Sequence, residues 1–238
     1  MNYKISYSMA PPRPPDTFSH ISALQRLRAL GWQPRTVYDI GAFHGQWSKD
    51  AAQVFSAAEY ILFEANADNE SQLKTSGRRY FIVALAAEDG AERSFFISKN
   101  VIATGASLYR ENTAYYSDAN HLVRKTSTAR LDSLIAAQKL NPADLIKIDV
   151  QGAELDVLAG AKDAVGRCDV LVLETSLLNY NKGAPLFGDV VAAVHQLGFK
   201  CIDVCEIHRI GPGLIFQMDL LFVRDDLYRR YHSAAGLL

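Results

Sequence analysis

Two acidic residues and two glycines follow strand-like runs in a spacing that suits a small ligand with an amino group and hydroxyls. Asp39, Gly41 and Gly45 lie in VYDIGAFHGQW, where a strand-like run passes into a helix-like one. Glycine lets the backbone N–H groups of such a turn approach a ligand closely. Glu64 ends the next strand-like run, EYILFE, where a carboxylate can accept from both hydroxyls of a ribose. These residues predict a binding site at the carboxyl edge of a parallel sheet.

The glycine spacing separates this site from the common nucleotide-binding motifs. It lacks the middle glycine of the dinucleotide fingerprint, and no Lys-Ser or Lys-Thr follows to form a phosphate loop. The Asp39 carboxylate can balance an ammonium group, whereas it would repel a pyrophosphate. An amino group and a ribose on one cofactor indicate S-adenosylmethionine. In the alternative interpretation, the glycines are only turn residues and Glu64 is a strand-end charge. Asn66 is expected to cap the following helix.

Further acids end two later strand-like runs, where they could act on a methyl acceptor. Asp149 ends LIKID, and Glu174 ends VLVLE. Methyl transfer from a sulfonium is an in-line displacement that needs the acceptor oxygen aligned and its proton removed. We interpret Asp149 as the first candidate for the base or a metal ligand, and Glu174 as a residue that could share Mg²⁺ or the acceptor hydroxyl with it. The alternative for both is an ordinary strand-end acid.

Three more ionisable residues lie near these positions. His44 lies inside the glycine turn, and its unperturbed pKa suits proton transfer near neutrality, so it is a further catalytic candidate. Lys147 shares a sheet face with Asp149 by the period of two in a strand, which favours an ion pair. Glu154 falls in the first turn of the next expected helix, where the helix dipole explains a negative charge.

The order of strand-like and helix-like runs predicts how these residues are positioned. The runs alternate through residues 36–86 and again through 144–175, which predicts βαβ units and a mostly parallel sheet with helices on both faces. Residues 199–210 and 216–224 flank GPG and predict an antiparallel pair that closes the sheet. The fold class is therefore α/β.

The remaining segments are expected to cover or flank the sheet. Residues 1–16 contain APPRPPD, whose prolines favour a flexible leader, and residues 17–238 are expected to form a single domain. Apolar spacing predicts a helix in 18–31 that stops at Gly31. A hairpin is expected at AERSFFIS. The polar loops 99–128 and 175–189 are candidates for acceptor recognition.

Composition narrows the class of protein. The chain has 238 residues, 49% hydrophobic, and its 25 Lys and Arg against 26 Asp and Glu give a formal net charge of −1, so no nucleic-acid partner is expected. No stretch approaches the roughly 18 apolar residues of a membrane span, and the N-terminus lacks a signal pattern. Three cysteines without a disulfide spacing agree with a reducing compartment. We therefore expect a cytoplasmic protein.

Six segments of the chain resemble the FkbM family of S-adenosylmethionine-dependent methyltransferases. They are VYDIGAFHGQW, LFEANADNESQL, VALAAEDG, ARLDSL, LIKIDVQGAELDVLAGA and VLVLE, in this order between Val37 and Glu174. The resemblance implies the class I methyltransferase fold, typically with seven strands and the last inserted antiparallel. It also implies methyl transfer to oxygen, since family members methylate hydroxyls of sugars, glycans and macrolide-type natural products.

The matching segments also imply which residues bind the cofactor. The expected set is Asp39, Gly41, Ala42, Phe43, Gly45, Trp47, Glu64, Ala65, Leu85, Ala86, Asp149 and Gln151. Gln151 stands where many relatives have Glu, which puts in doubt any scheme that needs a carboxylate there. FEAN likewise replaces the usual Glu-Pro but keeps Glu64.

Three other functions compete with an O-methyltransferase. A radical enzyme is disfavoured because CIDVCEIH places His208 where a third cluster thiolate is needed. An NAD-dependent oxidoreductase is disfavoured by the missing glycine. A non-catalytic S-adenosylmethionine-binding or scaffold protein would differ only in its lack of turnover. The acceptor, the metal dependence, the base and the oligomeric state stay open.

Overall fold

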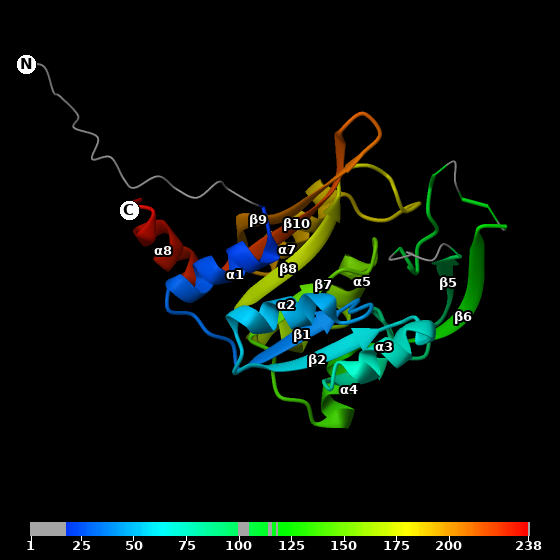
Figure 1. Ribbon diagram of the computed structural model, residues 1–238, viewed down its shortest axis with the longest axis horizontal. Helices are drawn as coiled ribbons and strands as arrows, with labels where there is room; N and C mark the ends of the chain where they lie inside the picture. The colour runs from blue at the N-terminus through cyan, green and yellow to red at the C-terminus, as the bar shows by residue number, and fades with distance from the viewer. Residues whose placement is uncertain (1–17, 100–104, 114–115, 118, 238) are drawn as a thin grey trace, which may run out of the picture.

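The computed structural model describes residues 18–99, 105–113, 116–117 and 119–237, so the expected leader 1–16 lies outside the described residues. Its centre is a seven-stranded sheet (Figure 1). In spatial order the strands are β3 (Arg79–Ile82), β2 (Glu59–Glu64), β1 (Thr36–Ile40), β7 (Leu145–Ile148), β8 (Val170–Ser176), β10 (Leu214–Arg224) and β9 (Phe199–Ile210). β10 runs antiparallel to both neighbours, whereas the other pairs are parallel. This confirms the expected α/β sheet with its inserted antiparallel strand.

Helices pack on both faces of this sheet because the strands bury side chains on both. One face is covered by α1 (His20–Ala29), α2 (Gln46–Val54), α3 (Glu70–Thr75) and α8 (Asp225–Ala234). The other is covered by α4 (Leu131–Gln138), α5 (Glu154–Ala159), α6 (Lys162–Arg167) and α7 (Phe187–Gln196). None of the helices within the described residues is long and apolar enough to cross a membrane.

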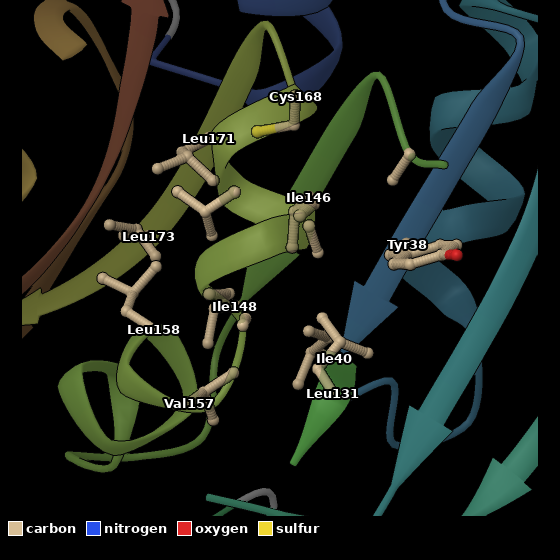
Figure 2. Close-up of a cluster of buried hydrophobic side chains, with 14 of the residues drawn as sticks. Tyr38, Ile40, Leu131, Ile146, Ile148, Val157, Leu158, Cys168, Leu171 and Leu173 are labelled. Atoms are coloured by element: carbon tan, nitrogen blue, oxygen red, sulfur yellow. The ribbon is translucent and has the colours of Figure 1, made fainter. Parts of the chain in front are cut away.

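The central strand β7 shows how one sequence serves both faces. Ile146 and Ile148 belong to the hydrophobic cluster on the α5 side, where Figure 2 shows Ile148 near Val157. Leu145 belongs to the cluster on the opposite side. Since side chains alternate along a strand, Lys147 shares the face of Leu145. The side chain of Lys147 therefore lies on the α1 and α2 side of the sheet.

A second, three-stranded sheet departs from the sequence-based expectation. It contains β4 (Ala84–Leu85), β6 (His121–Ala129) and β5 (Glu92–Ser98) in the order β4-β6-β5. A hairpin was expected within AERSFFIS, but the segment forms the single strand β5, which pairs antiparallel with β6. β6 lies mostly in the segment expected to be a loop. The strand was not predicted because its sequence, HLVRKTSTA, is largely polar and lacks a clear alternation of apolar residues. The run YFIVALA likewise splits between the two sheets at Val83.

Two glycines mark the ends of helices in the structure. Gly31 follows α1 in a left-handed conformation with φ of 79°, as the sequence predicts. Gly160 separates α5 from α6. A Cβ on Gly160 would lie 2.0 Å from the carbonyl oxygen of Ala86, so this close approach of two backbones requires glycine.

We predict that Gly160→Ala lowers the free energy of unfolding by about 1–3 kcal/mol, because the added methyl group meets backbone and not a flexible side chain. Gly166→Ala is the matched control, since Gly166 is a helical residue of α6 with open space around its Cβ position. It should be neutral or stabilise by roughly 0.5–1 kcal/mol. Urea unfolding measures both, and equal losses in the two variants would contradict the close contact.

Candidate active site

A cavity of ≈ 990 Å³ lies at the carboxyl ends of the parallel strands. This volume is at the upper end of the roughly 300–1,000 Å³ that is usual for small-molecule sites. Ten of the predicted site residues line it: Gly41, Ala42, Phe43, Trp47, Glu64, Ala65, Leu85, Asp149, Gln151 and Glu174. The structure therefore brings together the ends of β1, β2, β7 and β8 around one space.

Four predicted site residues are not among the residues that line the cavity: Asp39, His44, Gly45 and Ala86. His44 is exposed, and its ring stacks on that of Phe43 with centroids 3.6 Å apart. Gly45 immediately precedes α2 as its N-cap in a left-handed conformation, and its Cβ position faces Leu62 of β2. Among the candidate proton acceptors, the carboxylates of Asp149 and Glu174 are those that face the cavity.

The glycine turn and Glu64 form one hydrogen-bonded unit at the cofactor side of the cavity. Glu64 Oε2 accepts from the N–H of Phe43 at 2.8 Å, and Oε1 accepts from the N–H of Asn66 at 2.7 Å. Phe43 has a left-handed φ of 49°, which is uncommon outside glycine. A Cβ on Gly41 would lie 1.8 Å from the carbonyl oxygen of Asp149, so the turn packs directly on the chain beyond β7. Both carboxylate oxygens of Glu64 are thereby held in place.

Asn66 has the structural role that the sequence suggested. It precedes the short helix η1 (Ala67–Asn69), and its side chain accepts from the N–H of Asp68 at 3.2 Å.

Lys147 forms the predicted ion pair and joins two strand-end acids. Its Nζ lies 3.1 Å from Oδ2 of Asp149, 3.5 Å from Oδ1 of Asp39 and 3.3 Å from the carbonyl oxygen of Gly41. Asp39 is fully buried and accepts from the Ser48 hydroxyl at 2.6 Å. Burial alone would lower the pKa of Lys147, but the adjacent carboxylates raise it above its usual range. Asp39 does not line the cavity itself, but its charge helps to hold Lys147, which does.

Gln151 bridges the two predicted catalytic acids. Its Nε2 lies 3.2 Å from Oδ1 of Asp149 and 2.9 and 2.7 Å from the two oxygens of Glu174. Its φ is 55°, another left-handed non-glycine conformation on the cavity wall. The amide therefore lies between the two carboxylates, in the position that a shared cation would need.

The two acids differ in their electrostatic surroundings. Burial alone would raise the pKa of Asp149, but the charge and hydrogen bond of Lys147 outweigh it and hold this pKa below its usual range. Burial raises the pKa of Glu174 well above its usual range, and the negative charge of Asp149 adds to this effect. Asp149 is thus the more readily ionised of the two.

The structure adds residues on β9, β10 and α1 that the sequence analysis did not assign to the site. His20 Nε2 lies 2.7 Å from Oδ2 of Asp219 and 3.5 Å from Glu206. Burial alone would lower the pKa of His20, but hydrogen bonds, the strongest to Asp219, raise it to about 11. All three residues line the cavity, as does His208. One feature of the sequence could have indicated this part of the site: Asp219 is an acidic residue within the apolar run FQMDLLFVR.

The two loops predicted to recognise the acceptor lie against each other. The N–H of Asn112 donates to the carbonyl of Tyr180 at 2.6 Å, and that of Lys182 donates to the carbonyl of Arg110 at 2.8 Å. Tyr180 lines the cavity. In the first loop, the hydroxyl of Tyr109 is engaged by α5, because it donates to Asp156 at 3.1 Å.

Comparisons with known proteins concern the family and the fold of the chain. The model of the Methyltransferase FkbM domain matches residues 39–201. The crystal structure of methyltransferase FkbM from Methylobacillus flagellatus KT has a TM-score of 0.50 at 13% identity, over 79% of this chain and 43% of that one. Magnesium protoporphyrin IX methyltransferase from Synechocystis PCC 6803 with bound SAM has a TM-score of 0.49 at 12% identity, over 86% and 77%. No curated protein sequence matched.

This chain thus spans less than half the length of the FkbM structure from Methylobacillus flagellatus.

We predict that Lys147→Met lowers the free energy of unfolding by about 3–5 kcal/mol, because it leaves the buried Asp39 carboxylate without its cation. Lys200→Met is the control, since Lys200 pairs with Asp225 on the surface and its loss should change stability little. Chemical denaturation of both variants measures the difference. A Lys147→Met protein as stable as the control would show that the buried pair has no stabilising role.

Proposed function

This chain belongs to the FkbM methyltransferase family, and from that premise we propose that it transfers the methyl group of S-adenosylmethionine to a hydroxyl oxygen. The proposed acceptor is a sugar, a glycan or a hydroxylated secondary metabolite. The observation that carries the proposal is the fixed orientation of Glu64 at the end of β2. Each of its two oxygens accepts one backbone N–H, which fixes the direction of the carboxylate on the cavity wall. A carboxylate held in this way can accept from both hydroxyls of a ribose.

The walls next to Glu64 suit the other parts of the cofactor. Ala65, Ala84 and Leu85 provide apolar surface for an adenine ring. The Nε1–H of Trp47 is buried and has no hydrogen-bond partner among the described residues. Because an unpaired buried donor is costly, a ligand acceptor at this position, such as the carboxylate of the methionine part, would satisfy it.

The opposite part of the cavity suits a hydroxylated acceptor. Asp149 is held by Lys147 in its ionised form, so it can accept the proton of a hydroxyl as the methyl group is transferred. Gln217 offers hydrogen bonds on the same wall, and the rings of Tyr180 and Phe216, 5.4 Å apart, offer surface on which a sugar or macrocycle can stack. We therefore propose Asp149 as the base.

The geometry gives no support to Mg²⁺ shared by Asp149 and Glu174. The amide nitrogen of Gln151 donates toward both carboxylates, and it would repel a cation placed between them. The proposed reaction therefore uses no metal at that position.

We predict that Glu64→Ala weakens binding of S-adenosylmethionine by about 10- to 100-fold, since two charge-assisted hydrogen bonds are lost. Glu59→Ala is the matched control, because Glu59 begins the same strand at the edge remote from the cavity and is exposed. Calorimetric titration of the wild type and both variants measures the effect, with NAD titrated in parallel. Wild-type affinity in Glu64→Ala, or saturable binding of NAD in place of S-adenosylmethionine, would overturn the cofactor assignment.

We predict that Asp149→Asn lowers turnover by at least about 100-fold while changing cofactor affinity much less, because the amide keeps the size of the side chain but cannot accept a proton. Release of S-adenosylhomocysteine with a panel of sugar and macrolide hydroxyls measures turnover, and Asp163→Asn on the exposed surface of α6 is the control. A wild-type protein that binds the cofactor but turns over no acceptor in the panel would favour the non-catalytic alternative.

A further inference from the structure

Three potential metal ligands come together on the cavity wall beyond the proposed base. Each of Glu174, His208 and Asp219 offers one ligand atom, and these three atoms lie within 4.8 Å of one another. The residues come from the adjacent strands β8, β9 and β10, and Asp219 pairs directly with Glu174 in the strand register. All three line the cavity. Strand pairing therefore places the cluster, and no loop conformation is needed to assemble it.

Asp219 supplies an independent sign that a ligand belongs here. Its side chain is 8% exposed, and its Oδ1 is buried without a hydrogen-bond partner among the described residues. The other oxygen, Oδ2, accepts from His20 Nε2 at 2.7 Å. An unsatisfied buried acceptor is unfavourable, and an unpaired carboxylate oxygen more so. A cation bound by Oδ1 would remove this cost.

A second group of ligand-type side chains shares Asp219 but is already occupied by its own contacts. His20, Glu206 and Asp219 also lie within ligand distance of one another. However, the distances from His20 Nε2, 2.7 Å to Asp219 and 3.5 Å to Glu206, are those of a hydrogen-bonded ion pair. In this pair, His20 holds Oδ2 of Asp219 and so orients the carboxylate. Residues that hydrogen-bond to metal ligands commonly have this role.

The charges around the cluster also favour a cation. Lys147 is placed between Asp39 and Asp149, and His20 is placed against Asp219. Within the described part of the chain, Glu174 has no cationic partner and accepts only from the neutral amide of Gln151, which must turn away from Glu174 when an ion binds. The wall at Glu174 and Asp219 thus carries more carboxylates than cations.

We propose that Glu174, His208 and Asp219 bind one divalent transition-metal ion. One imidazole nitrogen with two carboxylate oxygens suits Mn²⁺, Fe²⁺, Co²⁺ or Zn²⁺, whereas Mg²⁺ and Ca²⁺ prefer oxygen ligands alone. A tetrahedral ion with bonds near 2.1 Å needs its ligand atoms about 3.4 Å apart, which small side-chain rotations can reach. Three protein ligands leave coordination positions open toward the cavity.

The metal site can exist whether or not the proposed function is correct. The role that we give to the metal, however, rests on the proposed function. An ion on the cavity wall can coordinate the acceptor hydroxyl, lower its pKa and hold it in position. Asp149, which is not a ligand in this arrangement, then remains available to accept the proton.

The test is metal binding by the full chain, after chelator treatment and without S-adenosylmethionine. Calorimetric titration with Mn²⁺ and with Zn²⁺, together with the visible absorption of the Co²⁺ form, gives affinity, stoichiometry and ligand type. We expect one site per chain for at least one of these ions, with affinity reduced by at least about 10-fold in His208→Ala and in Asp219→Asn. His195→Ala is the control, because His195 is an exposed histidine on α7.

Two results would overturn the proposal: no saturable binding by the folded wild type, or wild-type affinity and Co²⁺ absorption in His208→Ala. Thermal unfolding shows whether each variant is folded, and half-buried His208 is the safer substitution. Titration of His208→Ala with S-adenosylmethionine separates the two hypotheses. Loss of metal binding with cofactor binding retained supports the metal site, whereas failure of the wild type to bind the cofactor contradicts only the proposed function.

Discussion

The burial of one ammonium group between two strand-end carboxylates is the constraint on which the site depends. Lys147 is nearly inaccessible, and it contacts Asp39 on β1, Asp149 after β7 and the carbonyl of Gly41. Charges removed from water are stable only with close partners, so these groups must keep one arrangement. The same arrangement brings the glycine turn against the chain after β7, where the absence of a Cβ is required. The shape of the cofactor side thus follows from how a buried charge is neutralised.

The remaining polar residues follow from the alternation of side chains along neighbouring strands. On the face that carries Lys147, the strands end in acids, whereas on the opposite face Ile146 and Ile148 pack into an apolar cluster. The inserted strand β10 continues this polar row with Asp219 opposite Glu174. A binding site and a hydrophobic core are therefore built from the same strands with no insertion between them.

The sequence predicted those features that depend on local pattern. Strand ends and helix starts placed Glu64, Asp149 and Glu174 at one edge, because the ends of parallel strands meet there. The direction of His44 within its turn depends on backbone conformation that no periodicity reveals. The partnership of His20 with Asp219 depends on packing between segments far apart in the chain. Strand β6 was missed because its alternating side chains are mostly polar.

The contact between His20 and Asp219 joins residues 199 positions apart. Helix α1 is therefore made well before β10, the strand that carries its partner. Until β10 pairs with β8, the edge of the sheet at β8 is open and the acidic wall is incomplete. Since chains are made at about 5–20 residues per second, the nascent protein must pass several seconds in this state. The acidic wall of the cavity is therefore completed only after the segments on both sides of it in the sequence have been made.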